Sequence, residues 1–345
     1  MPIWPLATPS LPAALARPAL LPKRAATACL LAGVLALGAS SLAKPALAKS
    51  DDGLVQALSD IRAQDQKMQD IGWKLASANA RYCAKTTLSI GLQLVDVTGY
   101  RKPDQARSAF GLPGDFAIYT IAAGSPAAQT ALAPLQPLTS IDGATVDSWV
   151  AQPHSDWKRL TRAHDAIEQS LAADGKVVLA LTDSREETLA GEMVCASRFE
   201  LGGSDKRAFA NGSRVVLGRK FPGFAYPEDE LAAAIAHELA HNILAHRVWL
   251  DSNGRKRKHV RTTEREADRL MPWLLANAGY NPDAATRFMQ RWGPKHGGGL
   301  LRKRSHDGWD ERVEFITAEV EQIQALLSAD QPANWSEHFR RETGP

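Results

Sequence analysis

Two histidines and a glutamate near the middle of the chain have the spacing of a metal-dependent hydrolase. His237, Glu238 and His241 lie in the apolar run LAAAIAHELAHNILAH, just after Tyr226-Pro227 and three acidic residues. Proline and acids favour a helix start, so the run predicts a helix. Helix positions four apart share one face, which lets both imidazoles converge on one Zn²⁺. Glu238 at the flank of that face can take a proton from water held by the metal.

A catalytic zinc ion needs a third protein ligand, and the next histidine is badly placed to supply it. His246 lies nine residues after His237, which puts it on the opposite side of a continuous helix. We therefore expect His246 to be a structural residue or to support a ligand, not to bind metal. A structural pair of histidines on an amphipathic helix is the alternative to a metal site.

Two acids in the next charged segment are better placed to complete the site. Glu264 and Asp268 are four residues apart, on one face of a second predicted helix that Thr262 or Thr263 caps. Glu264 would be the third ligand. Asp268 would accept the second N–H of a ligand histidine and so fix its tautomer. The alternative is an exposed charged helix face, which also accounts for Glu266.

These motifs together resemble one family of zinc peptidases. HELAH followed by Glu264-x-x-Ala267-Asp268 is similar to the gluzincin family of HtpX, the type I CAAX prenyl endopeptidases and the periplasmic BepA-like proteases. The resemblance covers residues 200–325. Three further segments resemble family elements: an edge strand at 208–216, an Ala-Gly-Tyr-Asp-Pro turn at 278–282, and a late Thr-His-Pro…Arg segment at Ser305-His306 and Arg312.

The resemblance implies a role for each residue of the site. Zinc would be held by His237, His241 and Glu264, with Glu238 as the general base. The edge strand would align an extended peptide against the metal. The residues expected to bind that peptide are Ser213, Arg214, Val215 and Val216. His306 would gate the zinc or help at the oxyanion, with a surface histidine as the alternative, and Arg312 would pair with a nearby acid.

The segment before residue 199 has a different pattern and resembles a PDZ domain. Short alternating runs at 88–97 and 116–121 predict strands, and a helix is expected at 156–173. The motifs SPAA and SIDG match the PDZ pattern, and Ile90-Gly91-Leu92 would be the loop that receives a peptide carboxylate. Such a domain binds an extended peptide at a sheet edge. A spacer that only positions the next domain is the alternative.

The N-terminus has the pattern of a secretory signal. Lys23-Arg24 precedes an apolar run at 25–43, and small residues allow cleavage after Ala43 or Ala48. An uncleaved anchor is the alternative. Export would leave Cys83 and Cys195 as an even pair in an oxidising compartment, so we expect a disulfide between them, with two buried free thiols as the alternative.

The charge balance limits the partners. Residues 1–48 hold four basic residues and no acids, which leaves 37 basic against 38 acidic residues in the rest of the chain. A nucleic-acid partner is therefore not expected. After residue 48 no stretch is long and apolar enough to span a bilayer, so a prenylated protein is not the expected substrate. Basic runs at 255–259 and 302–304 leave peripheral contact with a membrane surface open.

These observations combine into one hypothesis. The expected fold is α+β, a mainly helical gluzincin metallopeptidase domain with a short edge sheet and an inserted PDZ-like domain. The expected function is an exported (periplasmic or secreted) zinc endopeptidase that cleaves misfolded or envelope proteins. The alternatives are a zinc-bound adaptor or chaperone-like protein with latent proteolysis, and a peptide sensor with structural zinc. The expected segments are a signal at 1–48, a helical lead at 49–85, the PDZ-like domain at 86–198, the peptidase domain at 199–330 and a tail at 331–345.

Overall fold

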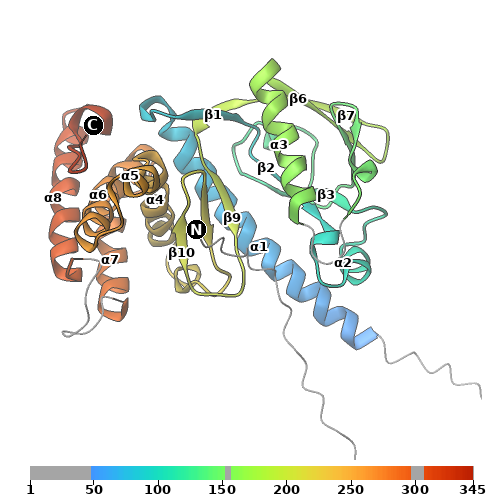
Figure 1. Ribbon diagram of the computed structural model, residues 1–345, viewed down its shortest axis with the longest axis horizontal. Coiled ribbons are helices and arrows are strands. Elements are labelled where there is room, and N and C mark those ends of the chain that lie inside the picture. The colour runs from blue at the N-terminus through green and yellow to red at the C-terminus, as the bar shows by residue number, and fades with distance from the viewer. Residues whose placement is uncertain (1–47, 152–156, 297–306, 345) are drawn as a thin grey trace, which may run out of the picture.

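One long helix separates a strand-rich region from a mainly helical one in the computed structural model (Figure 1), which describes residues 48–151, 157–296 and 307–344. The predicted signal segment lies outside the described residues except for Ala48, and His306 lies outside them too. The fold is α+β, as predicted. No helix within the described ranges combines the length and the hydropathy needed to cross a membrane.

The separating helix α1 (Ala48–Ala78) covers most of the predicted helical lead. Its apolar residues Met68, Ile71 and Leu75 are fully buried in the core of the helical region. Its polar residues contact both regions. Gln66 donates to the Ile121 carbonyl of the strand-rich region at 2.6 Å, and Gln69 donates to the Phe199 carbonyl of the helical region at 2.6 Å. The two regions are therefore fixed to a common helix.

The strand-rich region (residues 86–195) has small antiparallel sheets with the orders β1-β8, β2-β3 and β5-β4-β6-β7. The predicted strand at 88–97 is interrupted by Gly91, whose φ of 66° turns the chain between β1 and β2. A second core lies under α3, separate from that of the helical region. The elements are η1 (Ala80–Tyr82), β1 (Thr86–Ser89), β2 (Leu92–Asp96), η2 (Val97–Gly99), α2 (Pro103–Phe110), β3 (Phe116–Ile121), η3 (Ala127–Gln129), β4 (Leu138–Ile141), β5 (Ala144–Thr145), η4 (Val146–Ser148), α3 (Trp157–Asp174), β6 (Lys176–Leu181), β7 (Glu186–Ala190) and β8 (Glu192–Cys195).

A disulfide closes the base of the strand-rich region. Cys83 lies just before β1, Cys195 ends β8, and their Cα atoms are 5.6 Å apart. The predicted pairing is therefore confirmed. It joins the two points at which the chain enters and leaves this region, and in the chain-entropy model a loop of this length stabilises the fold by about 4–5 kcal/mol.

The helical region (residues 198–344) packs helices against a three-stranded sheet with the order β10-β11-β9. Figure 1 shows these helices on the opposite side of α1 from α3. Its largest fully buried side chain, Trp273, donates its indole N–H to Glu319 at 2.7 Å. The elements are β9 (Arg198–Leu201), β10 (Ala208–Ala210), β11 (Arg214–Leu217), η5 (Pro222–Ala225), α4 (Glu228–Ile243), α5 (His246–Asn253), α6 (Arg257–Asn277), α7 (Asp283–His296), α8 (Trp309–Ser328) and α9 (Trp335–His338).

The segment expected only as a tail belongs to the core of the helical region. Trp335 and Phe339 are both 7% exposed and pack with the buried residues of α4, α6 and α8. The Trp335 indole N–H donates to the buried Asn79 side chain at 3.1 Å. Residues 331–344 are thus held between α1 and α6, which matters for the site described next.

Candidate metal centre

Helix α4 carries the first two donors. Alanine and leucine favour its helical backbone, and acids at Glu228, Asp229 and Glu230 stabilise its N-terminus. His237 and His241 lie one turn apart on it, and both are largely buried. The helix ends at Ile243 with Leu244 as its C-cap, because Ala245 adopts a left-handed conformation with φ of 53°.

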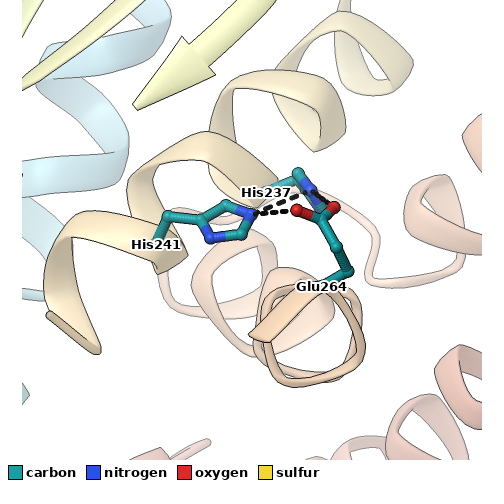
Figure 2. Close-up of side chains that lie close together, drawn as sticks. All are labelled: His237, His241 and Glu264. Atoms are coloured by element: carbon teal, nitrogen blue, oxygen red, sulfur yellow. Dashed lines mark hydrogen bonds and ion pairs between the residues drawn. The ribbon is translucent and has the colours of Figure 1, made fainter. Parts of the chain in front are cut away.

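Helix α6 supplies the third donor by packing directly against α4. Figure 2 shows the Glu264 carboxylate facing the two imidazoles. His237 Nε2 is 3.3 Å from His241 Nε2 and 3.4 Å from Glu264 Oε2, and His241 Nε2 is 3.5 Å from Glu264 Oε1. Ligands at about 2.1 Å from a tetrahedral Zn²⁺ stand about 3.4 Å apart, so the three donors fit a metal ion of that size. The predicted group His237, His241 and Glu264 can therefore hold a metal ion.

The ring nitrogen of His237 that faces away from the other donors lies next to the carboxylate of Asp268. His237 Nδ1 lies 3.0 Å from Asp268 Oδ1, one turn after Glu264 on α6. Arg312 on α8 binds the same carboxylate with two N–H groups, at 2.6 and 2.7 Å. Asp268 is 1% exposed at its side chain, so burial raises its pKa, but Arg312 and His237 outweigh that effect and hold the pKa below its ordinary value. Asp268 thus lies beside the second ring nitrogen of a donor histidine, and Arg312 pairs with an acid, as predicted.

The other ring nitrogen of His241 meets a histidine. His241 Nδ1 lies 2.9 Å from His246 Nδ1, and His246 Nε2 lies 2.8 Å from Glu266 Oε2. His246 and Glu266 are 1% and 0% exposed. The interpretation of Glu266 as part of an exposed charged face is therefore wrong, since its side of α6 is covered by α5 and by residues 341–343.

The protonation states follow from burial and from these neighbours. Burial lowers the pKa of His241 to about 3, so this imidazole is neutral and has a lone pair for a metal. Burial also lowers the pKa of His237, but the neighbouring carboxylates of Asp268 and Glu264 outweigh it and raise the pKa to about 10. Metal binding must therefore displace a proton from His237. Burial raises the pKa of the Glu238 carboxyl to about 7.

The edge of the sheet beside the site belongs to β10. Strand β11 pairs with β10 on one side and with β9 on the other, so both of its edges are used. The segment 208–216 expected as the edge strand thus contains the edge strand β10, but the residues expected to bind substrate, Ser213, Arg214, Val215 and Val216, lie on or next to the inner strand β11. Because Arg207 and Asn211 bond to β11, the peptide groups of Ala208 and Ala210 point to the open edge. The Ala210 N–H interacts with the Glu238 carboxylate there.

A cleft of about 2140 Å³ runs from these residues into the strand-rich region. Its walls include His237 and Glu238 at one end, Phe209 of β10 in between, and Leu160 and His164 of α3 at the other end. Among the described strands β2 pairs only with β3, so its second edge faces α3 along this cleft. His164 accepts the Leu94 N–H of β2 at 3.5 Å.

The contact of His246 with His241 agrees with the expected supporting role, but sequence reasoning missed the turn that brings the two rings together and the start of α6. The nine-residue spacing places His246 opposite His237 only if the helix continues, and the left-handed Ala245 ends it. Helix α6 begins at Arg257, within the basic run 255–259, so Thr262 and Thr263 lie inside the helix and do not cap it. The burial of Glu266, two residues from Glu264, has no signal in the sequence, because its partners lie 20 to 77 residues away along the chain.

No protein-family model matches the chain, and no curated protein matches it. The site therefore rests on its own geometry: three converging donors, a buried acid beside them and an open strand edge.

Proposed function

We propose that the protein is an exported zinc-dependent endopeptidase of the gluzincin type. The observation that carries the proposal is the set of three donors 3.3–3.5 Å apart with Glu238 on the next position of the same helix. Two imidazoles and one carboxylate are the ligand set of catalytic zinc peptidase sites, which leave a fourth position open. A zinc ion bound there supplies a Lewis acid for the scissile carbonyl and activates water.

Glu238 would be the general base. It is half-buried, and its pKa of about 7 lies near neutral pH, where one group can accept a proton from water and later release it to the leaving amine. Its position beside the open edge of β10 puts it next to the peptide groups of Ala208 and Ala210. An extended substrate would pair with this edge and so place one amide at the metal.

The strand-rich region would hold a second part of the substrate, as a PDZ-like domain. The support is the unpaired edge of β2 beside α3, in the same cleft as the metal donors. An extended chain that adds to this edge would reach the metal site without leaving the protein surface. Such a long cleft suits unfolded protein substrates, in line with misfolded envelope proteins as the substrate class.

A second candidate function is a zinc-bound adaptor or chaperone-like protein with latent proteolysis. The observation that favours it is the extent of the cleft, which runs well beyond the metal donors along α3. In this case peptide binding at β2 would be the main activity.

Casein hydrolysis by the mature chain, beside Glu238→Gln, tests the proposal. Bound zinc is counted in both proteins, because the variant keeps all three ligands. Cleavage by the wild type alone, with about one zinc in each protein, supports the peptidase. Zinc in both proteins without cleavage by either, together with retained binding of unfolded peptides, favours the adaptor. Zinc in neither protein contradicts both proposals.

A further inference from the structure

The chain of contacts that starts at His241 continues beyond Glu266 to residues 341–343. The Glu266 carboxylate accepts the backbone N–H groups of Glu342 and Thr343 and the Thr343 hydroxyl; the two Thr343 distances are 2.8 Å. Arg341 lies 3.6 Å from the same carboxylate and donates to the Leu244 carbonyl at the end of α4, at 2.8 Å. Every one of these donors belongs to a segment more than seventy residues after Glu266.

The direction of each hydrogen bond follows from metal binding. His241 uses Nε2 toward the other donors, so its Nδ1 carries the hydrogen and donates to His246 Nδ1. His246 must then carry its own hydrogen on Nε2, which donates to Glu266 Oε2. Glu266 as a carboxylate only accepts, which suits the donors of residues 341–343 on its other side. The arrangement leaves no donor facing a donor.

We propose that residues 341–343 form part of the metal site, as a clamp that fixes Glu266 and, through His246, the ring of the ligand His241. The inference rests on the proposed function for the identity of the metal. Glu266, His246 and the clamp are positioning residues, since none of them touches the metal or the substrate.

Burial makes the clamp necessary. Glu266 is fully buried, and a buried carboxylate that loses its donors is strongly destabilising. Without the clamp Glu266 would turn toward other donors or take up a proton. His246 would then lose the acceptor that fixes its tautomer, and His241 would bind metal with a mobile ring. Loss of such an outer partner typically weakens metal binding about 10–100-fold.

The test is zinc affinity in the full chain, measured by competition with a chromophoric chelator. The variants are a chain that ends at Arg340, Thr343→Val, and Thr343→Ser as the conservative partner that keeps the hydroxyl. Glu337→Gln, at an exposed position of α9, is the matched control outside the clamp. The visible spectrum of the Co²⁺-loaded protein reports the geometry of the three ligands independently of activity.

We expect zinc affinity to fall about 10–100-fold in the chain that ends at Arg340 and several-fold in Thr343→Val, each with an altered Co²⁺ spectrum. Thr343→Ser and Glu337→Gln should match the wild type. Wild-type zinc affinity and Co²⁺ spectrum in Thr343→Val and in the shortened chain would overturn the clamp. If the shortened chain fails to fold, Thr343→Val against Thr343→Ser decides alone.

The two proposals fail in different ways. Zinc binding that depends on Thr343 in a protein that cleaves no casein supports the clamp and contradicts the peptidase. Casein cleavage with zinc binding that ignores Thr343 supports the peptidase and contradicts the clamp.

Discussion

Each of the two donor histidines needs a partner that fixes its ring, but the partners come from different parts of the molecule. His237 has its Nδ1 against Asp268, whose charge is balanced by Arg312 of α8. His241 has its Nδ1 against the neutral imidazole of His246. The nearest negative charge on this side is on Glu266, which contacts the other ring nitrogen of His246. The first support is short and ionic, and the second is long and ends in backbone N–H groups of residues 341–343.

This difference separates two effects of a supporting residue, the orientation of the imidazole ring and the charge placed beside it. Both supports fix a ring, but only Asp268 places a full negative charge 3.0 Å from a donor histidine. A charge that close makes the imidazole a stronger base and a stronger ligand. We therefore expect metal binding by His237 to depend on the charge of its support, and metal binding by His241 to depend on the orientation of its ring.

The largest expected effect comes from Glu264, the third donor beside His237 and His241. Glu264→Ala removes one of three protein ligands, so zinc affinity should fall by roughly 1000-fold or more, beyond the loss expected from either support. Zinc content after dialysis against a weak chelator measures this. A variant that retains a full zinc equivalent would remove Glu264 from the ligand set.

Breaking the ionic support comes next. Asp268→Asn keeps the shape of the side chain but removes its charge, so zinc affinity should fall about 10–100-fold. Arg312, which is largely buried, would lose its counter-ion, and the metal-free protein should become about 3 kcal/mol less stable. Chelator competition and urea unfolding measure the two losses. A stable variant with normal zinc affinity would show that the charge near His237 is not needed.

Acid should weaken the second support in the metal-free protein. Burial raises the pKa of Glu266, but hydrogen bonds from His246 and Thr343 outweigh it and lower the pKa from 4.5 to about 2. A lowered carboxylate pKa stabilises the fold above pH 4.5, and this stabilisation is lost as the pH falls toward 2. The stability difference between wild type and Glu266→Gln should therefore shrink by about 3 kcal/mol over this range, in urea unfolding at a series of pH values. A difference that does not change with pH would contradict the clamp's hold on an ionised Glu266.

The smallest expected effect is on the neutral link. His246→Asn offers an acceptor and a donor on a shorter side chain, so part of the geometry is kept while the charge on Glu266 is untouched. Zinc affinity should fall about tenfold, less than in Asp268→Asn, because no charge next to a donor is lost. The same chelator competition compares the two variants directly. An equal or larger loss in His246→Asn would reverse the proposed division between charge and geometry.

Local patterns predicted much of the fold. The apolar runs gave α4 and the strands β2 and β3, the helical spacing gave α1 and α3, and the even cysteine pair gave the disulfide Cys83–Cys195. The start of α6 was missed because Thr262 and Thr263 suit a helix cap, whereas the helix already begins at Arg257 within the basic run. The role of residues 331–344 was missed because a short segment carries no periodic pattern that shows whether it is buried. Its burial depends on distant partners, such as Asn79 for Trp335.

The candidate site divides in the same way. Residues four apart on a helix predicted the three donors and Asp268, since spacing within one helix fixes which side chains share a face. The supporting role of His246 was among the expectations, but its contact with Glu266 was missed because that contact depends on the turn at Ala245 and on the packing of α5 against α6. Within the predicted edge segment 208–216, the substrate-binding residues were placed on β11 and not on β10, because the sequence of a hairpin does not say which of its strands stays unpaired.

The distance along the chain between Glu266 and its donors has a consequence for synthesis. A growing chain carries His237, His241 and Glu264 long before it carries Thr343, which follows Glu266 by 77 residues. During that interval the three ligands exist but His241 lacks its final support. If residues 341–343 act as the proposed clamp, the nascent protein would bind metal only loosely until the helical region has closed around them.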